Sequence, residues 1–335
     1  MKRRPTITDV AAAAGVSVAT VSKAMNGRYG ISEATVRRVL DVVEEMGYQS
    51  SIVASSMRSR RTGVIGVLVA DFEPFSAEIL KGVGAALRDS EYDLLAYSGA
   101  QQGGHDGWER KSLSRLSGTL IDGAIMVTPS IVTVPEEIPM VAIDPHTGPA
   151  DLPTVESDNF TGALQATQHL VELGHRRIGF LAGRPDLRSS IRRHDGYRRA
   201  LADAGIPFDP ALVGVGNYLQ QTAREPASAL LSLRNRPTAI FAANDVMAIG
   251  ILEVAASLGL RVPDDLSVIG FDDVPEASRA NPPLSTIRQP MQTLGAAAAK
   301  LLLALLNGDQ PQETHLRLPT RLVRRATTGP PPPAR

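Results

Sequence analysis

The sequence predicts two parts: a small all-α helix-turn-helix head and a larger α/β body built from two doubly wound parallel sheets. The chain has 335 residues, more than the roughly 100–200 residues of one ordinary domain. Its first 48 residues contain three short segments with helical apolar spacing and a glycine between the first two. From residue 63 onward, apolar β-rich runs alternate with amphipathic stretches, which predicts parallel strands covered by helices on both faces.

The composition excludes several classes of protein and site. Hydrophobic residues make up 43% of the chain and charged residues 21%, a globular rather than a disordered composition. Cysteine is absent, which excludes disulfides, cysteine-ligated zinc and thiol catalysis and fits a reducing compartment. The longest apolar stretch, 295–306, is interrupted by Lys300 and is shorter than the roughly 18 residues that span a membrane. Since no export signal follows Arg4, we expect a cytoplasmic protein.

Charge is unevenly distributed along the chain. The net charge is +0, yet residues 1–61 hold ten Lys and Arg against five Asp and Glu. A basic head on an acidic body predicts that the head alone meets a polyanion. A solvated basic surface is the alternative.

The head contains signals for the ends of its helices. Thr6 and Asp9 have capping-box spacing, and Gly15 can adopt the positive φ of the turn after the first helix. Ser17 is expected to cap a second helix, and a third is expected from 32 to 47. The expected core consists of Ala11, Ala14, Val16 and Val21 together with a third-helix stripe of Val36, Val39, Leu40, Val43 and Met46.

The second of these helices has the composition of a DNA-reading element. In a helix-turn-helix unit this helix enters the major groove, with its first exposed side chains against base edges. Val18, Ala19 and Lys23 would face outward, and an outward Val–Ala pair suits contact with thymine methyl groups. The alternative is a three-helix cap that binds no nucleic acid.

Residues 6–71 resemble the LacI/GalR family of bacterial transcription regulators. The matching segments are TITDVAAAAGVSVATVSKAMNG, ISEATVRRVLDVVEEMGY and RRTGVIGVLVAD. The resemblance continues through LGHRRIGFLAG, PTAIFAANDVMAIG, LSVIGFDDVP and PPLSTIRQP, and so covers nearly the whole chain. It implies a DNA-binding head, a hinge, and a periplasmic-binding-protein-like body of two lobes with a cleft between them.

The resemblance also implies which residues contact DNA. The partner would be a near-palindromic double-stranded operator bound by a homodimer. Base readout would fall on Val18, Ala19 and Lys23. Phosphate contacts would fall on Thr6, Ser17, Thr20, Ser22, Asn26, Ser32, Thr35 and Tyr48, and Arg28 is added from its charge alone.

The domain boundaries follow from the same comparison. The head would cover 1–49, the hinge or linker 50–62, and the body 63–329, followed by a disordered Pro-rich tail at 330–335. The hinge would place Ser51, Ala54 and Met57 in the minor groove, with Met57 as the wedge between base steps. The family usually has Pro-Asn and then Ala-Arg-Ser-Leu here, whereas this chain has Ser50-Ser51 and then Ala-Ser-Ser-Met. A disordered tether is the alternative. A proline tail cannot form a coiled coil, which favours a dimer.

The body contains strand-like and helical runs in alternation. Strands are expected at 64–70, 94–97, 124–127, 140–143, 178–181, 239–242 and 267–271, and helices at 77–88, 162–173 and 246–258. By resemblance, one lobe would comprise 63–158 and 290–316 and the other 159–288 and 317–329. The chain would then cross between lobes near 157–161, 288–290 and 316–318.

Polar and aromatic residues at the carboxyl ends of the strands predict a ligand site. They are Asp71, Phe72, Asp144, Asn244, Asp245, Asp272 and Gln289, with Arg184, Arg188 and Arg193 after another strand. Carboxylates, amides and arginine bind neighbouring hydroxyls, so the set suits a sugar. The resemblance places Asp272, Asn244 and Gln289 in the cleft, with Asp144, Phe72, Tyr218 and either Arg188 or Arg193.

Local alternatives exist for several of these residues. Asp245 is expected to cap the following helix rather than bind a ligand. The arginines could pair with Asp186 or Asp195. The single Trp108 is expected to pack rather than bind.

The function predicted from these features is a sequence-specific DNA-binding repressor of sugar-utilisation genes, controlled by a small-molecule effector, most simply a sugar. No phosphate-binding loop, dinucleotide fingerprint, metal-ligand spacing or G-x-S-x-G elbow occurs, so neither an enzyme nor a cofactor is expected. A purine- or nucleoside-responsive co-repressor-type regulator is the alternative within the class. A sugar-binding transport component and a doubly wound sugar-metabolising enzyme are the alternatives from other classes.

Overall fold

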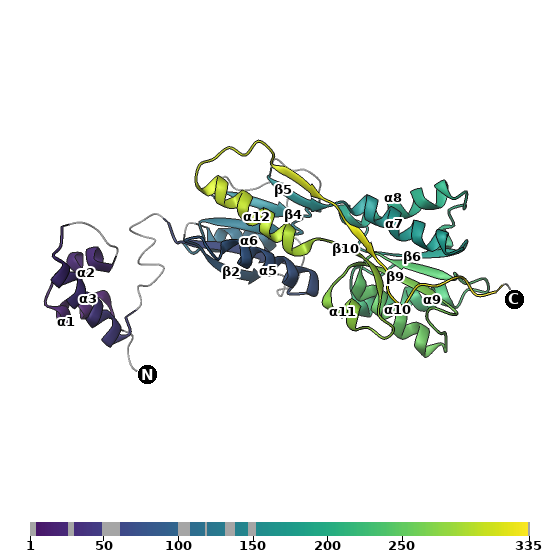
Figure 1. Cartoon of the computed structure of the whole chain (residues 1–335), viewed down its shortest axis with the longest axis horizontal. Helices are drawn as coiled ribbons and strands as arrows, with labels where there is room; N and C mark the ends of the chain where they lie inside the picture. Colours follow the sequence, from purple (N-terminus) through teal and green to yellow (C-terminus); the bar gives the residue numbers. More distant parts are fainter. Residues whose placement is uncertain are drawn as a thin grey trace. The chain divides into compact units, whose positions relative to one another are not determined.

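The computed structural model describes residues 5–25, 30–48, 61–99, 108–117, 119–130, 138–146 and 152–333. The chain divides into two compact units, Met1–Thr62 and Gly63–Arg335, which are described separately (Figure 1). The first unit is helical in its described part. The second contains two parallel-stranded sheets with helices, so the predicted fold class is confirmed.

The head consists of α1 (Ile7–Ala14), α2 (Val18–Met25) and α3 (Glu33–Met46). α1 begins with the predicted capping box, in which the Thr6 backbone N–H donates to Asp9 Oδ2 at 2.7 Å. Gly15 and Gly47 end α1 and α3 in the left-handed conformation, with φ of 65° and 59°. Both φ values would strain an ordinary L-residue, which is why glycine occupies these two positions.

The three head helices enclose a small apolar core. Its buried members are Val10, Ala11, Ala14, Val21, Ala24, Val39 and Tyr48, with Val16, Val36, Val42, Val43 and Met46 packed against them. The prediction for Leu40 was wrong, because Leu40 is 45% exposed. The buried face of α3 is turned toward Val42, so Leu40 lies at the outer edge of the stripe and faces away from α1 and α2.

The first sheet of the body has the strand order β11-β5-β4-β3-β1-β2, and its strands pair in parallel. The strands are β1 (Val64–Val69), β2 (Asp93–Ser98), β3 (Gly123–Val127), β4 (Met140–Ile143), β5 (Thr154–Ser157) and β11 (His315–Leu318). The helices are α5 (Pro74–Leu87), α6 (Trp108–Leu116) and α12 (Met291–Leu306). Alternate side chains of β1 pack on opposite faces of the sheet. Ile65 and Val67 pack against α5 and α12 on one face, and Leu68 packs against Trp108 of α6 on the other. Trp108 is therefore a packing residue, as predicted.

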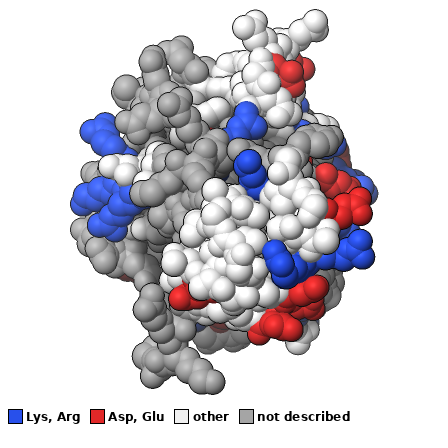
Figure 2. Space-filling view, turned by 90° about the vertical axis from the view of Figure 1, so that its left-hand side faces the viewer, with Lys and Arg blue, Asp and Glu red and all other residues white. Residues whose placement is uncertain are grey.

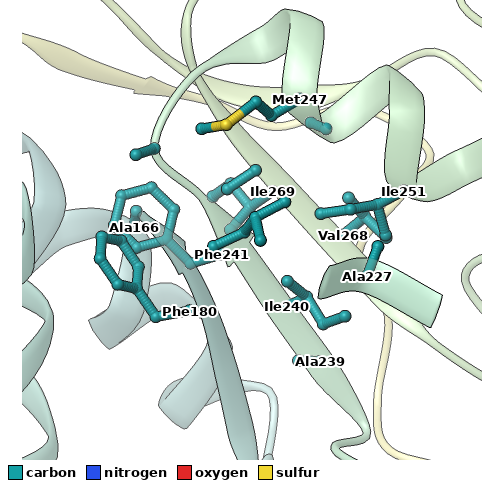
Figure 3. Close-up of a cluster of buried hydrophobic side chains, with 14 of the residues drawn as sticks. Ala166, Phe180, Ala227, Ala239, Ile240, Phe241, Met247, Ile251, Val268 and Ile269 are labelled. Carbon is teal, nitrogen blue, oxygen red and sulfur yellow. The ribbon is translucent and has the colours of Figure 1, made fainter. Parts of the chain in front are cut away.

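The second sheet has the order β12-β10-β9-β8-β6-β7. Its strands are β6 (Ile178–Ala182), β7 (Val213–Val215), β8 (Ala239–Ala242), β9 (Ser267–Asp272), β10 (Ser285–Arg288) and β12 (Arg321–Val323). Around it lie α7 (Asn159–Glu172), α8 (Arg188–Asp203), α9 (Gln220–Leu231), α10 (Asp245–Ser257), α11 (Pro275–Arg279) and the 3₁₀ turn Pro210–Leu212. β12 pairs antiparallel with β10, a departure from the all-parallel expectation. Figure 3 shows part of the core on this sheet, in which Phe180 and Phe241 lie beside Ala166 of α7, and Ile251 of α10 lies beside Val268 and Ala227.

The chain crosses between the two sheets three times: between β5 and α7, between β10 and α12, and between β11 and β12 (Figure 1). The first two crossings lie where the sequence analysis placed them. The third lies slightly later, because Arg317 and Leu318 still pair with Glu156 and Ser157 of the first sheet. The second lobe therefore resumes after residue 318 rather than at 317.

The chain is anchored to the second lobe just before its Pro-rich end, and the disorder expected at 330–335 stays a prediction. Residues 330–333 are described, and Gly329 is held at both backbone groups. Its N–H donates to Ser267 Oγ at 3.0 Å, and its carbonyl oxygen lies 2.9 Å from His175 Nε2. Proline segments need no internal hydrogen bonds, so they can follow a surface once an adjoining residue anchors them.

Among the helices of the described residues, none is long and apolar enough to cross a membrane.

Candidate functional site

The predicted base-reading residues lie on the outer face of α2. Val18, Ala19 and Lys23 are exposed, whereas Val21 and Ala24 of the same helix are buried against α1 and α3. The structure thus leaves an apolar pair and one cation available to a partner. This division follows from the 3.6-residue period, because positions 21 and 24 share one face of the helix.

Two matching hydroxyl pairs mark the starts of α2 and α3. Ser17 and Thr20 lie with their hydroxyl oxygens 2.9 Å apart, and Ser32 and Thr35 do the same at 2.9 Å. In each pair the serine oxygen also accepts the threonine backbone N–H. One hydroxyl hydrogen of each pair remains able to donate outward, at a helix N-terminus where the dipole favours an anion.

The other predicted phosphate contacts are less uniform. Thr6 Oγ1 donates to Asp9 Oδ2 at 2.7 Å, Ser22 is half-buried, and Tyr48 belongs to the head core. Asn26 and Arg28 lie outside the described residues, as do the hinge residues Ser51, Ala54 and Met57. Their roles stay predictions.

The basic excess of the head is not carried by the described helices. Four of its ten cations lie in described residues, Lys23, Arg37, Arg38 and Arg61, beside all five acids. The other six lie at positions 2–4, 28, 58 and 60. Figure 2 shows one side of the molecule, on which the blue and red side chains of described residues are interspersed with uncharged surface. Most of the cations that give the head its net positive charge therefore lie outside its three helices in sequence.

In the body, strained residues gather at the carboxyl ends of strands. Positive φ occurs at Asp144 (45°) after β4, Asp272 (123°) at the end of β9, and Tyr218 (65°) beyond β7. Such conformations are costly for non-glycine residues and cluster at binding sites, where surrounding contacts hold them. All three residues were predicted cleft residues.

Arg193 is the centre of the cluster that these residues form. It is 4% exposed, and its Nη1 lies 3.5 Å from Asp272 Oδ1. Its Nε donates to Asn159 Oδ1 at 2.8 Å, and its Nη1 donates to the Ala243 carbonyl oxygen. The guanidinium carbon lies 3.8 Å from the centre of the Phe271 ring. A buried cation on an aromatic face, with a carboxylate beside it, is held rigidly in one orientation.

Asp272 and Gln289 form the second half of the cluster. Gln289 Nε2 donates to Asp272 Oδ1 at 2.6 Å, and the Gln289 backbone N–H donates to the Asp272 carbonyl oxygen at 3.0 Å. Burial raises the pKa of Asp272 to about 7, an effect that Arg193 and Gln289 oppose only in part. Gln289 Oε1 is buried and has no hydrogen-bond partner within the described part of the chain.

Asp144 joins the cluster from the first lobe. Its Oδ1 accepts the Ser157 backbone N–H at 3.2 Å and Asn159 Nδ2 at 3.5 Å. Burial raises its pKa to about 6, and Arg193 opposes the rise. Asn159 therefore connects Asp144 to Arg193. The sequence analysis did not select Asn159; the signal was its place next to the Asp158 cap, where the chain passes from one lobe to the other.

The expectation for Asp245 was wrong, because Asn244 is the N-cap of α10. Asn244 Oδ1 accepts the Met247 backbone N–H at 3.1 Å, and its Nδ2 donates to the Tyr218 carbonyl oxygen at 3.2 Å. Asp245 is fully buried and accepts from Val274 N at 3.0 Å and Thr286 Oγ1 at 2.5 Å. Asn244 thus binds the Tyr218 backbone while also capping the helix.

The remaining predicted residues are dispersed. Phe72 is 53% exposed, and Arg184 pairs with Asp186 at 2.6 Å. Arg188 lines a cavity of about 200 Å³ beside the first crossing, together with Asp144 and Ser157. The structure therefore brings together Asp144, Arg193, Tyr218, Asn244, Asp272 and Gln289, and Arg188 borders the same cavity as Asp144.

Comparison with known proteins identifies the family. A profile described as "Bacterial regulatory proteins, lacI family" matches residues 6–51, and one described as "Periplasmic binding protein-like domain" matches residues 167–328. The chain is 34% identical to the HTH-type transcriptional regulator CelR of Thermobifida fusca over 337 residues, which cover 96% of this chain and 98% of CelR. The chain belongs to the lacI family of bacterial regulatory proteins.

Further members of the lacI family match along most of their length. The HTH-type transcriptional repressor CytR of Escherichia coli is 35% identical, with 95% of this chain and 93% of CytR covered. The solved Lac repressor dimer bound to operator and the anti-inducer ONPF has a TM-score of 0.84 at 27% identity, covering 98% of this chain and 100% of that one. The solved CelR–cellobiose complex has a TM-score of 0.72 at 32% identity, covering 97% and 100%. The protein is accordingly a DNA-binding transcriptional regulator and not an enzyme.

Proposed function

We propose that this regulator represses transcription as a homodimer bound to a near-palindromic operator, and that a sugar-class effector in the interlobe cleft controls its operator affinity. The observation that carries the effector half is the buried Arg193–Asp272–Gln289 cluster with its unpartnered Gln289 oxygen. The Lac repressor dimer solved on its operator and CelR solved with cellobiose support the two halves. Such a regulator would act in the cytoplasm, where the chromosome lies.

The chemistry of the cluster suits neighbouring hydroxyl groups. Arg193 retains N–H donors beyond those used on Asn159 and Ala243, and Gln289 Oε1 retains an acceptor. A vicinal diol can accept hydrogen bonds from the Arg193 N–H groups and donate one to Gln289 Oε1 at the same time. A buried acceptor without a partner costs about 1–3 kcal/mol, and a ligand hydroxyl would remove that cost. The exposed ring of Phe72 could then cover the C–H face of the sugar.

On the DNA side, Val18, Ala19 and Lys23 would read bases, and the two hydroxyl pairs at the starts of α2 and α3 would bind phosphates. The support is their shared exposure and the outward donor that each pair retains. Thr6, Ser22, Asn26, Arg28 and Tyr48 complete the proposed phosphate set, and Ser51, Ala54 and Met57 the minor-groove set. Phosphate contacts supply affinity, and base contacts supply sequence preference.

Effector control requires that the ligand bind one lobe arrangement more tightly than the other. Each tenfold difference in ligand affinity shifts the operator equilibrium by about 1.4 kcal/mol. The cluster is suited to this, since Asp144 lies in the first lobe and Arg193 in the second. Whether the ligand releases or strengthens operator binding depends on which arrangement it prefers.

The deciding experiment selects preferred duplexes from a randomised library with the full chain, and then titrates the selected duplex by fluorescence anisotropy. A panel of monosaccharides, disaccharides and purines is added, and ligand binding is read separately as a rise in melting temperature. We expect a palindromic consensus and at least a tenfold change in operator affinity with one panel member. A purine response would favour the alternative effector class.

Two variants assign the effector site. Asp272→Asn should abolish the effector response while retaining operator binding, because the carboxyl paired with Arg193 is lost. Asp264→Asn, at an exposed ion pair with Arg261 on the same lobe, should respond like the wild type. A normal response in Asp272→Asn would remove Asp272 from the site. Equal affinity for selected and random duplex at several ionic strengths would overturn the DNA-binding proposal.

A further inference from the structure

The turn after β9 has a strained backbone at two successive residues. Asp272 has a φ of 123° and Asp273 a φ of 62°, both in the region that favours glycine. Residues other than glycine keep such angles only where the surrounding contacts enforce them. Because Asp272 is the carboxyl group that we assign to the effector, whatever holds Asp273 also determines where the Asp272 side chain lies.

Asp273 is held by two arginines, and we call Arg288, Asp273 and Arg325 the arginine clamp. Arg288 Nε donates to Asp273 Oδ2, and Arg325 Nη2 donates to Asp273 Oδ1 at 2.5 Å. The Asp273 side chain is 4% exposed, so these charge-assisted bonds are shielded from water. Each carboxylate oxygen has its own cation, which prevents the side chain from turning and keeps the strained turn in place.

Neighbouring contacts hold the clamp in position. Arg325 Nη1 also donates to the Leu284 carbonyl oxygen at 2.7 Å. The backbone N–H of Val274, the residue next to Asp273, donates to the buried Asp245 carboxylate at 3.0 Å. The turn is therefore held both at the clamp and at the residue that follows it.

The clamp connects this turn to the two strands of the second lobe that adjoin a crossing. Arg288 is the last residue of β10, and the chain crosses to the first lobe shortly after it. Arg325 follows β12, the strand with which the chain re-enters the second lobe, and β12 pairs antiparallel with β10. Gln289, the residue after Arg288, donates to Asp272 through both its side chain and its backbone. A movement of the crossing strands would therefore displace the Asp272 turn with them.

We propose that the arginine clamp positions Asp272 for the effector and couples its position to the arrangement of the lobes. The inference rests on the proposed function, since it takes Asp272 as an effector contact, and it adds regulation to that site. Asp273 is a positioning residue, because both of its carboxylate oxygens are used within the clamp. Effector affinity then depends on the charges of Arg288 and Asp273, although these side chains act through Asp272.

The test compares variants that differ in charge at one position. Arg288→Gln removes the cation, whereas Arg288→Lys keeps a cation that can form the same single ion pair; this side chain is 40% exposed, so both variants should fold. Asp273→Asn removes the carboxylate charge but keeps a residue type that tolerates positive φ. The control is Asp209→Asn, which breaks an ion pair with Arg177 on the same lobe.

The ligand probes are glucose, ribose, cellobiose and adenosine, and the one that binds the wild-type full chain most tightly by calorimetry is used throughout. We expect Arg288→Gln and Asp273→Asn to bind it about tenfold more weakly, since a charge-assisted bond of the clamp is lost. Arg288→Lys should retain most of the affinity, and Asp209→Asn should bind as the wild type does. Matched melting temperatures of the two Arg288 variants without probe would show that the affinity difference is not a loss of folding. Equal probe affinity in these two variants would overturn the clamp.

A second measurement needs no effector. Hydrogen–deuterium exchange followed by mass spectrometry reads the backbone N–H groups of Val274 and Gln289, whose hydrogen bonds close the turn. They should exchange about tenfold faster in Arg288→Gln than in the lysine variant or the control, because the turn opens locally. Equal exchange in all of them would overturn the clamp. If the wild type bound none of the probes, the effector proposal would fail, while the exchange rates would still decide whether the clamp holds Asp272.

Discussion

Replacing Gly82 by alanine should destabilise the first lobe, because α5 and α12 touch backbone to backbone at this point. A Cβ on Gly82 would lie 2.0 Å from the Gln292 carbonyl oxygen and 2.7 Å from its Cα. On the facing helix, a Cβ on Gly295 would lie 2.2 Å from the Ile79 carbonyl oxygen. These two glycines are what allow the helices to approach so closely.

The size of the effect follows from these distances. Ordinary contact begins at 3.4 Å, so the helices must separate by roughly 1.4 Å. The obstacle is backbone, which cannot rotate aside as a side chain can. Overpacking usually costs about 1–3 kcal/mol, and we expect the upper end here. The higher helix propensity of alanine offsets about 0.5–1 kcal/mol of this cost. The free energy of unfolding should therefore fall by about 2 kcal/mol net, which lowers the melting temperature by about 4–8 °C.

Gly84 is a matched control on the same helix. A Cβ there would meet nothing within 4 Å. Gly84→Ala should therefore raise the free energy of unfolding by about 0.5–1 kcal/mol, through the higher helix propensity of alanine alone. The assay is urea unfolding followed by fluorescence of Trp108, which is the chain's single tryptophan and is buried in the first lobe. A Gly82→Ala midpoint at or above that of Gly84→Ala would refute the close helix contact.

Three further predictions concern the head, the cleft and the chain end. Lys23→Ala should lower affinity for the selected operator by about tenfold yet lower affinity for random duplex much less, as anisotropy would show; an equal loss on both would make Lys23 a phosphate contact. Burial raises the pKa of Asp272 to about 7, well above the roughly 3.9 of an unfolded aspartate. Between these two pH values the folded state holds a proton that the unfolded state has lost, so the free energy of unfolding falls as the pH rises from about 4 to about 7. The stability of Asp272→Asn relative to wild type should therefore increase between pH 5 and 8, and a flat difference in urea midpoints would contradict the raised pKa. Truncation after Thr328 removes the Gly329 partners of His175 and Ser267 and should cost about 1–3 kcal/mol in circular-dichroism melts, whereas an unchanged melt would show that the anchored end contributes nothing.

Local sequence chemistry was sufficient for the head. The Thr6–Asp9 box and the positive-φ glycines 15 and 47 act within one helical turn, so their positions in the chain determine the helix ends. The outward face of α2 followed because burying Val21 and Ala24 leaves Val18 and Lys23 exposed. Leu40 was misplaced, because periodicity marks a stripe but the packing of α1 and α2 selects which edge of it is covered.

The cleft shows the opposite balance. The sequence analysis selected Asp272 and Arg193 individually, but their 3.5 Å contact joins β9 to α8 across the fold. Whether Asn244 or Asp245 caps α10 depends on the residue at which β8 ends. A shift of that end by one residue would exchange their roles. Asn159 became recognisable only through its neighbours in space.

By itself the sequence determined the class of protein, the helix ends and the residue types available at the strand ends, since these depend on spacing within a turn or a strand. The tertiary structure alone decided which carboxylates, amides and guanidinium groups are buried together, which of them lack partners, and that the proline-rich end is anchored to the second lobe. The physical reason is that desolvation and hydrogen-bond satisfaction depend on groups far apart in the chain, and no local pattern records which of them will meet.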